Sequence, residues 1–329
     1  MAAETYATNE PDVFTSVEIC AGAGGQAIGL EAAGFRHLAC VEIDPNACST
    51  LRANRPGWNV VETDVRTWRP SEDLRDVDLL AGGVPCPPFT VAGKQLGPDD
   101  ERDLFPEMIR LAQEINPKMI MIENVRGILA RKFDCYRTEI VKALSDLGYE
   151  FLGWELLNAS HFGVPQARQR AILVMAKPEV AQFFSWPTPD GLFTTVGSVL
   201  APLMAENGWQ GHLEWAARAQ GVAPALVGGS KKHGGADLGP TRAKNQWREL
   251  GVDGHGLADN PPSPDFEGDP RLTVKMAAAI QGFPSDWQIQ GRKTAAYRQI
   301  GNAFPPPVAR AVGSALQSAL FAASLGTAA

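Results

Sequence analysis

The sequence predicts an α/β protein with one sheet of parallel strands and a smaller, loop-rich region towards the carboxyl end. Apolar runs of strand length recur at 13–19, 38–42, 77–81, 118–122 and 171–175. Helical spacing of apolar residues separates or follows them at 26–33, 103–115 and 134–147. Strands that alternate with helices in this way form a parallel sheet with helices on both faces.

The first predicted strand, 13–19, leads into a turn that contains Gly22, Gly24 and Gly25. Glycines at a strand-to-helix turn let the backbone approach a ligand closely. The spacing differs from that of a dinucleotide site, because the next glycine after Gly25 is Gly29. Taken alone, the glycine cluster fits a plain tight turn as well as it fits a ligand loop.

Two carboxylates follow the turn. Glu42 ends the predicted strand 38–42, and Pro45 then opens a helix with Asp44 as its N-cap. Glu42 is placed to accept hydrogen bonds from ribose hydroxyls, and Asp64 to read an adenine amino group. Both carboxylates being merely solvated is the simpler interpretation, but together with the glycine turn they favour an adenosine-type cofactor.

Cys86 follows the predicted strand 77–81 in a frame of glycine and proline, Gly82-Gly83-Val84-Pro85-Cys86-Pro87. A lone cysteine is more often a buried, inert residue. Here the prolines fix the backbone, and ligands bind at the carboxyl ends of strands in open α/β sheets. The polar stretch 90–103 fits a surface loop or a mobile lid over the site. The frame therefore favours a nucleophile, which requires an activated thiol.

An acid and two cations complete the series. Glu123 directly follows the predicted strand 118–122, where it is either a neighbour of a helix N-cap or an acid that hydrogen-bonds a ring nitrogen. Arg168 and Arg170 alternate on a predicted strand, so both side chains are expected on one side. Nucleophile, acid and cations in this order predict attack on an electron-poor ring held by its polar edge.

The texture of the sequence changes near Trp186, and from there to about Phe266 it is rich in Gly and Pro with little periodicity. Helical patterns return at 272–281 and 307–325. We therefore predict one domain from residues 1–187 plus 285–329, and a smaller one from residues 188–284.

The net charge of −7 argues by itself against nucleic acid, because phosphate binding relies on Lys and Arg. Charge is unevenly distributed, however. Residues 226–250 carry more cations than carboxylates, and the cations are Lys231, Lys232, Arg242, Lys244 and Arg248. The sequence therefore leaves room for a basic surface on an acidic protein, or for five cations that are simply solvated.

The 329 residues include five cysteines with no Cys-x-x-Cys pair and five scattered histidines, so neither a disulfide framework nor a metal site is expected. No apolar run reaches the roughly 18 residues of a membrane helix. Residues 1–11 contain no Lys or Arg, unlike the start of a signal peptide. A cytoplasmic protein is the expectation.

Taken together, these motifs resemble those of the cytosine-specific DNA methyltransferases that modify carbon 5, of the bacterial restriction–modification type. Residues 18–25 look like the cofactor loop of that family and 41–44 like its ribose-binding segment. The segments similar to its catalytic motifs are 85–86, 123–125 and 166–170. Those similar to its recognition support and its last motif are 271–284 and 299–306.

The resemblance implies a Rossmann-like, S-adenosylmethionine-dependent methyltransferase domain with a smaller target recognition domain, residues 188–284. In that family the cysteine adds to carbon 6 of a flipped-out cytosine, and carbon 5 takes the methyl group. Cys86 would be the nucleophile, and Glu123 would hold the amino group and ring nitrogen 3. Arg168 would orient the base and stabilise the thiolate, with Arg170 in the same catalytic set.

The resemblance also implies the binding residues. Cofactor contacts are expected at Cys20, Ala21, Gly22, Gly24, Gly25, Glu42, Ile43, Asp64, Val65, Pro85, Leu104, Asn302 and Ala303. DNA contacts are expected at Thr90, Lys94, Arg102, Lys231, Lys232, Arg242, Lys244 and Arg248. Two positions depart from the family, with Cys20 where an aromatic residue is usual and Pro87 where a glutamine is frequent.

The expected partner is double-stranded DNA, with a separate restriction endonuclease or none, and the protein is expected to be a monomer at the nucleoid. A tRNA cytosine methyltransferase of the same fold is one alternative, although the Cys-Phe-Thr tripeptide of its eukaryotic branch is absent. A catalytically silent DNA-binding relative is another. A dinucleotide oxidoreductase is disfavoured by the glycine spacing.

Overall fold

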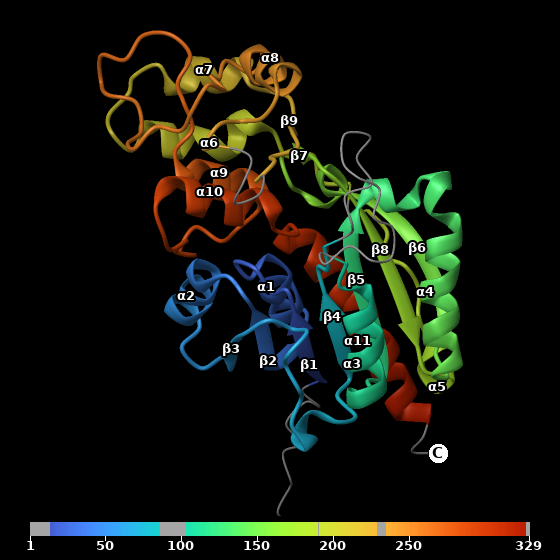
Figure 1. The fold of residues 1–329 in the computed structure, drawn as a ribbon. Helices are drawn as coiled ribbons and strands as arrows, with labels where there is room; N and C mark the ends of the chain where they lie inside the picture. Colours follow the sequence, from blue (N-terminus) through green and yellow to red (C-terminus); the bar gives the residue numbers. More distant parts are fainter. Residues whose placement is uncertain (1–13, 86–102, 190, 229–234, 327–329) are drawn as a thin grey trace, which may run out of the picture.

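A computed structural model describes residues 14–85, 103–189, 191–228 and 235–326, and its centre is a seven-stranded sheet (Figure 1). The strand order is β3-β2-β1-β4-β5-β8-β6. The strands are β1 (Phe14–Ile19), β2 (Phe35–Glu42), β3 (Val60–Glu62), β4 (Leu79–Gly82), β5 (Met119–Val125), β6 (Glu150–Asn158) and β8 (Gln169–Ala176).

The sheet is mixed, which corrects the prediction of a parallel one. Strands β1 to β5 are parallel, but β8 is antiparallel to both β5 and β6. A short connection without a long crossover helix joins β6 to β8, and such a connection joins antiparallel strands. Strand β6 was not predicted from the sequence, because Gly153 and Glu155 interrupt its apolar residues.

Helices cover both faces of the sheet, as predicted. These helices are α1 (Gly25–Ala32), α2 (Pro45–Asn54), α3 (Phe105–Ile115), α4 (Asp134–Asp146), α5 (Pro178–Ala181) and α11 (Pro306–Gly326). Alternate residues of a strand point to opposite faces. Met119 and Met121 of β5 therefore join the core under α1 and α11, whereas Ile120 and Ile122 join the core under α3 and α4.

By length and composition, the helical stretch 293–326 is apolar enough to cross a membrane. Its longer part, α11, places Val308, Val312, Leu316 and Leu320 in the core against the sheet. The helix therefore serves as a core helix in this fold (Figure 1).

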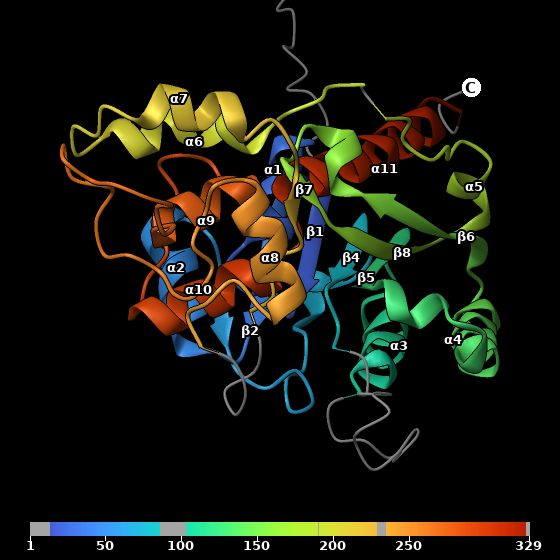
Figure 2. The ribbon, with the colours of Figure 1, turned by 90° about the horizontal axis from the view of Figure 1, so that it is seen from above.

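A second lobe, residues 191–228 and 235–292, lies beside the sheet and is more helical than the sequence predicted (Figures 1 and 2). Its helices are α6 (Val196–Ala205), α7 (His212–Arg218), α8 (Thr241–Glu249) and α9 (Val274–Gln281), and α10 (Lys293–Asn302) packs on α9. In α7 only Trp215 is fully buried, and in α8 only Trp247. One buried residue per helix leaves no period to detect, so these helices were missed.

The two lobes are joined at a short pair of parallel strands, β7 (Gln166–Ala167) and β9 (Ala223–Pro224). The second lobe and α10 share one apolar core, which includes Trp215, Trp247 and Tyr297. Helix α10 also lies next to α2 (Figure 2). The predicted domain boundary at 284/285 does not coincide with a gap in this core, and it stays a prediction.

The sheet topology defines where a ligand binds. From β1 the chain proceeds to β2 and β3 on one side, and then crosses to β4 and β5 on the other side. Loops that leave β1 and β4 therefore diverge, and in open α/β sheets the crevice at such a point is the usual binding site.

Candidate active site

The turn after β1 is held in conformations that favour glycine. Gly22 and Gly24 have φ values of 54° and 86°, in the left-handed region. A Cβ on Gly25 would lie 2.3 Å from the carbonyl oxygen of Phe304. The turn therefore requires glycine both for its backbone angles and for its close contact with the segment after α10.

Glu42 fixes the opposite side of this turn from the end of β2. Its carboxylate accepts hydrogen bonds from the backbone N–H groups of Gly22 at 2.7 Å, Ile43 at 2.8 Å and Asp44 at 2.7 Å. Two carboxylate oxygens offer about four acceptor positions, so capacity remains for a ligand hydroxyl.

A cavity of about 490 Å³ lies where β1, β2, β4 and β5 end, within the usual size range of small-molecule sites. The predicted cofactor residues that line it are Cys20, Ala21, Gly22, Gly25, Glu42, Pro85, Asn302 and Ala303. Those that do not line it are Gly24, Ile43, Asp64, Val65 and Leu104. The structure thus brings together segments from both ends of the chain at one cavity.

Sequence reasoning missed several polar residues of the cavity. Glu18 is only 1% exposed, and its Oε2 has no hydrogen-bond partner among the described residues. Burial raises the pKa of this carboxyl well above its usual range, although the neighbouring side chain of Gln26 acts in the opposite direction. The two polar atoms of that Gln26 side chain are buried and form no hydrogen bond of regular geometry within the described part of the chain. A charged residue inside an apolar strand was the available signal for Glu18.

Such orphaned polar groups at a cavity wall call for a polar ligand, because buried polar groups are normally hydrogen-bonded. Arg298, Gln299 and Asn302 of α10 add further polar side chains to the same wall. The donor and acceptor set fits a ligand with amino, carboxylate and hydroxyl groups, such as an adenosyl amino acid.

Glu123 lies in β5 with its carboxyl group at the cavity. Its Oε1 forms an ion pair at 2.7 Å with Nε of Arg170, which comes from the neighbouring strand β8. Burial raises the pKa of Glu123, although Arg170 and Arg168 act in the opposite direction. A Cβ on Gly83 would lie 3.2 Å from Oε2 of Glu123. The acid therefore lies against the segment that leads to Cys86.

Asn124 connects the same two segments, because its Nδ2 donates to the carbonyl oxygen of Val84 at 2.9 Å. The residue before Pro85 is thereby tied to the strand that carries Glu123. Cys86 itself lies outside the described residues, as do Thr90, Lys94, Arg102, Lys231 and Lys232.

Arg168 and Arg170 do not share one strand, which corrects the prediction. Arg168 falls between β7 and β8, and it is 1% exposed. Its guanidinium donates to the carbonyl oxygens of Leu226, Gly301 and Ala303, and it does not line the cavity. The expected contact of Arg168 with the base is therefore not supported, and Arg170 is the arginine beside the acid.

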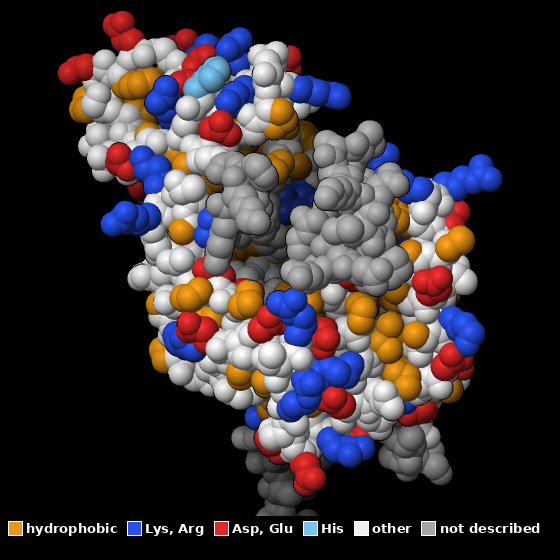
Figure 3. Space-filling model, in the orientation of Figure 1, with side chains coloured by type: hydrophobic (Ala, Val, Ile, Leu, Met, Phe, Trp, Pro, Cys, Tyr) orange, Lys and Arg blue, Asp and Glu red, His pale blue; other side chains and the backbone are white. Residues whose placement is uncertain are grey.

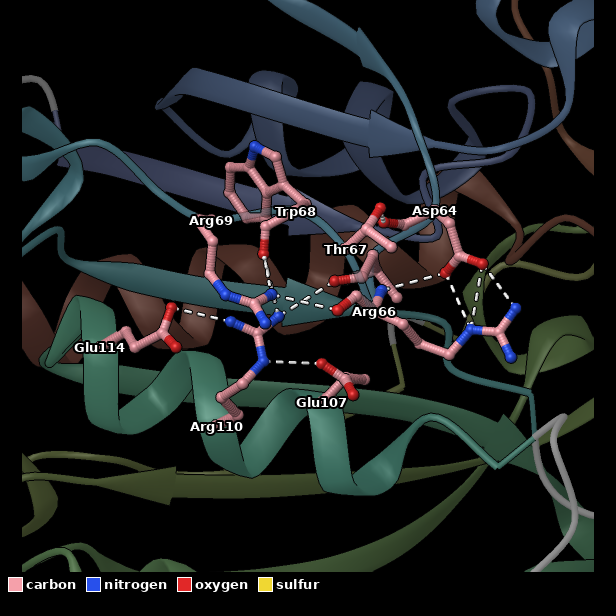
Figure 4. Close-up of polar contacts among 9 residues, drawn as sticks. Asp64, Arg66, Thr67, Trp68, Arg69, Glu107, Arg110 and Glu114 are labelled. Carbon is pink, nitrogen blue, oxygen red and sulfur yellow. Dashed lines mark hydrogen bonds and ion pairs between the residues drawn. The ribbon is translucent and has the colours of Figure 1, made fainter.

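Asp64 belongs to a group of polar contacts between the loop after β3 and helix α3 (Figure 4). Figure 4 shows Arg66 turned back onto Asp64, where its Nε donates at 3.0 Å, and this hydrogen bond lowers the pKa of Asp64. Arg110 of α3 donates to the carbonyl oxygen of Val65, and this hydrogen bond joins the loop after β3 to the helix. The assignment of Asp64, Val65 and Leu104 to cofactor binding stays a prediction.

The predicted DNA-contact cations that the structure describes in the second lobe differ in exposure and in ion pairing. Arg242 and Arg248 of α8 are exposed. Lys244 is paired with Asp237 at 2.9 Å, and its side chain is 20% exposed. Figure 3 shows basic and acidic side chains mixed on this lobe.

A larger cavity of about 800 Å³ lies between α6, α9 and residues 283–291. Its walls are mostly apolar, and it shares no residue with the cavity at Glu123. Two ion pairs, Lys275 with Glu206 and Lys293 with Asp259, involve residues at its wall. The smaller cavity, by contrast, holds the buried carboxyl groups of Glu18 and Glu123, so it is the better candidate for the active site.

The sequence matches the family described as C-5 cytosine-specific DNA methylase over residues 14–318. It is 55% identical over 310 residues to the type II methyltransferase M.NaeI of Lentzea aerocolonigenes, which covers 92% of this chain and 75% of that protein. It is also 55% identical over 311 residues to the type II methyltransferase M.NgoMIV of Neisseria gonorrhoeae, with 93% and 98% covered. A solved variant of DNMT2 from Spodoptera frugiperda is similar in fold, with a TM-score of 0.64, 18% identity, and 92% and 99% covered.

The chain belongs to the C-5 cytosine-specific DNA methylase family. It is a DNA (cytosine-5-)-methyltransferase whose cofactor is S-adenosylmethionine, as the resemblance of its motifs implied.

Proposed function

We propose that Cys86, Glu123 and Arg170 carry out the catalysis of this methyltransferase, with residues 188–284 selecting the DNA sequence. The observation that carries the proposal is the position of Glu123. It is a buried acid with a raised pKa, paired with Arg170, at the cavity that Glu42 and the glycine turn also line.

In this proposal the thiolate of Cys86 forms a bond to carbon 6 of a flipped-out cytosine. Glu123 donates its proton to ring nitrogen 3, so the charge that the thiolate brings to the ring is neutralised. S-adenosylmethionine, when bound, supplies the methyl group that carbon 5 accepts. A water molecule then takes the carbon-5 proton, the Cys86 sulfur leaves carbon 6 as the thiolate, and the nitrogen-3 proton returns to Glu123, which restores the ring.

Arg170 acts on Glu123 in this scheme. Its guanidinium holds the carboxyl group in place at 2.7 Å, and its charge keeps the pKa from rising further. The acid can thereby be reprotonated and deprotonated within one cycle.

For the cofactor, the fit of the described residues supports Glu42 at the ribose and the Glu18, Gln26 and Asn302 side chains at the amino acid end. Glu42 is held by three backbone N–H groups and has acceptor capacity left. The unpartnered polar atoms of Glu18 and Gln26 offer the remaining contacts.

The second lobe would read DNA through exposed side chains of α8. Arg242 and Arg248 are free to reach guanine edges or phosphates. Lys244 is a weaker candidate than the sequence suggested, because Asp237 already holds it. An Arg242→Ala variant that relaxes the methylated motif at one position would support base reading. A uniform, salt-sensitive loss of affinity would instead indicate a phosphate contact.

The similarity to type II methyltransferases supports a role beside a separate restriction endonuclease. We further propose that the protein acts on the host DNA as a cytoplasmic monomer. Plasmid methylated by this enzyme should resist an endonuclease that cuts the methylated motif.

The decisive experiment is bisulfite sequencing of plasmid from an expressing host that lacks cytosine methylation. One short motif should be protected with the wild-type protein and unprotected with Cys86→Ala. No protected motif from a folded protein that binds the cofactor would reject the proposal. Labelled cofactor offered with duplex DNA or with tRNA then identifies the substrate.

A further inference from the structure

Residues 226–228 of the second lobe lie directly against the end of α10, at the edge of the cofactor cavity. A Cβ on Gly301 would lie 2.3 Å from the backbone nitrogen of Gly228, and one on Gly228 would lie 2.4 Å from the carbonyl oxygen of Arg298. Side chains do not fit at such distances, so the two backbones meet because both residues are glycine. The same Cβ on Gly228 would lie 2.7 Å from Oδ1 of Asn302, which lines the cavity.

Arg168 forms hydrogen bonds to both of the segments that meet at this glycine contact. One of its terminal nitrogens donates to the carbonyl oxygen of Leu226 at 2.7 Å. The other donates to the carbonyl oxygens of Gly301 at 2.8 Å and Ala303 at 3.0 Å. A single buried guanidinium therefore binds the second-lobe segment and the two neighbours of Asn302 at once.

Gln166 is fully buried and adds further hydrogen bonds to the same two segments. Its Oε1 accepts from the backbone N–H of Leu226 at 2.8 Å, so both polar backbone groups of Leu226 are held from the segment 166–168. Its Nε2 donates at 2.7 Å to the side chain of Gln281, which in turn donates to the carbonyl oxygen of Ala303. A connected polar network of this kind makes its surroundings rigid.

We propose that Gly228 and Arg168 are positioning residues that place Asn302 at the cofactor cavity according to the position of the second lobe. The inference rests on the proposed function, since it takes residues 188–284 to hold the DNA. When bound DNA moves segment 226–228 or reduces its mobility, the position or mobility of Asn302 should change in the same way, because no side chain lies between the two backbones. The affinity for DNA and the affinity for the cofactor are thereby coupled through this contact, and each must strengthen the other by the same factor.

The test is a calorimetric titration with S-adenosylhomocysteine, with and without a duplex that carries the methylated motif. In the wild type the duplex should tighten S-adenosylhomocysteine binding by about 5- to 100-fold, a typical range for coupled sites. Gly228→Ala should reduce this factor towards 1. Gly235→Ala is the matched control, since a Cβ there meets no atom of the described residues within 4 Å, and it should keep the wild-type factor.

Arg168→Lys provides the second variant, because a lysine cannot bind three carbonyl oxygens in this arrangement. It should also lose the coupling factor, while thermal unfolding and binding of the duplex alone show that the fold persists. An unchanged factor in both folded variants would overturn the inference and leave the proposed function intact. A wild-type protein that binds S-adenosylhomocysteine but no duplex DNA would overturn the proposed function, and this inference with it.

Discussion

The sheet and the second lobe bury their apolar side chains in different patterns. In the sheet, successive residues alternate between two cores, as Ile120 and Met121 of β5 do under α3 and α11. In the second lobe, one large side chain anchors each short helix, Trp215 for α7 and Trp247 for α8. The first pattern is periodic, whereas the second depends on where a few tryptophans meet.

The functional site draws on both patterns. The sheet supplies the carboxylates Glu18, Glu42 and Glu123 at the ends of three strands, where regular geometry brings them together. Helix α10, whose core is shared with the second lobe, supplies Gln299 and Asn302 at the opposite wall. The rate of the chemical step is therefore expected to depend on the sheet. The position of the opposite wall of the cavity is expected to depend on the second lobe.

The largest effect should follow from Glu123→Gln, which keeps the shape of the side chain and removes the acid. Loss of one general acid typically lowers kcat by about 10²- to 10⁴-fold. Stopped-flow or single-turnover methylation of duplex DNA measures this directly. Glu155 of strand β6 is exposed and provides the control, because Glu155→Gln should keep the wild-type rate. A Glu123→Gln rate within a few-fold of wild type would remove Glu123 from the chemistry.

Trp215→Ala tests whether the second lobe is a separate unit of stability. The side chain is fully buried, and its indole N–H donates to the carbonyl oxygen of Gly251 at 2.7 Å. Removal should lower the free energy of unfolding by about 3–5 kcal/mol. Leu213→Ala on the same helix changes a side chain that is 68% exposed and should cost less than about 0.5 kcal/mol.

Hydrogen exchange then separates the two regions. Amides of 191–292 should lose protection in Trp215→Ala, while those of β5 stay protected, because local openings follow local packing. An equal loss of amide protection in β5 would show that the sheet and the second lobe unfold as one unit. That result would contradict the view that the two regions are separate units of stability.

The pH dependence of activity should report on Arg170. In the proposed mechanism protonated Glu123 is the active form, so activity is expected below its pKa and should be lost as the pH rises through it. Arg170 stabilises the carboxylate, and its removal raises the pKa of Glu123 further above the ordinary value. Arg170→Gln should therefore shift the alkaline limb of kcat/KM to higher pH. Arg126→Gln, an exposed arginine of the adjoining turn, should leave that limb in place. A shift to lower pH would contradict the assignment.

The sequence was sufficient for the parts of the site that depend on strand ends. The glycine turn and Glu42 were predicted at one edge of the sheet because parallel strands carry their carboxyl ends to the same place. Arg168 was placed on one strand with Arg170 wrongly, since alternation along a strand does not reveal that the strand breaks after Ala167, while its catalytic role stays a prediction. The contact of Gly228 with Gly301 leaves no trace in either local sequence, because it arises only when distant segments meet.

The smallest of these effects concerns the start of α6, where Thr195 caps the helix. Its hydroxyl oxygen accepts from the backbone N–H of Ser198 at 3.1 Å, and the Ser198 hydroxyl accepts from the backbone N–H of Thr195. Thr195→Ala should lower the free energy of unfolding by about 1 kcal/mol, measured by urea denaturation. Thr138→Ala makes the same substitution at an exposed position inside α4 and should be neutral or slightly stabilising, because alanine favours helix interiors. Equal losses in the two variants would mean that the hydroxyl at the helix start contributes nothing beyond its place in a helix. A loss confined to Thr195→Ala would show that caps, like the tryptophans, fix the short helices of the second lobe where periodicity does not.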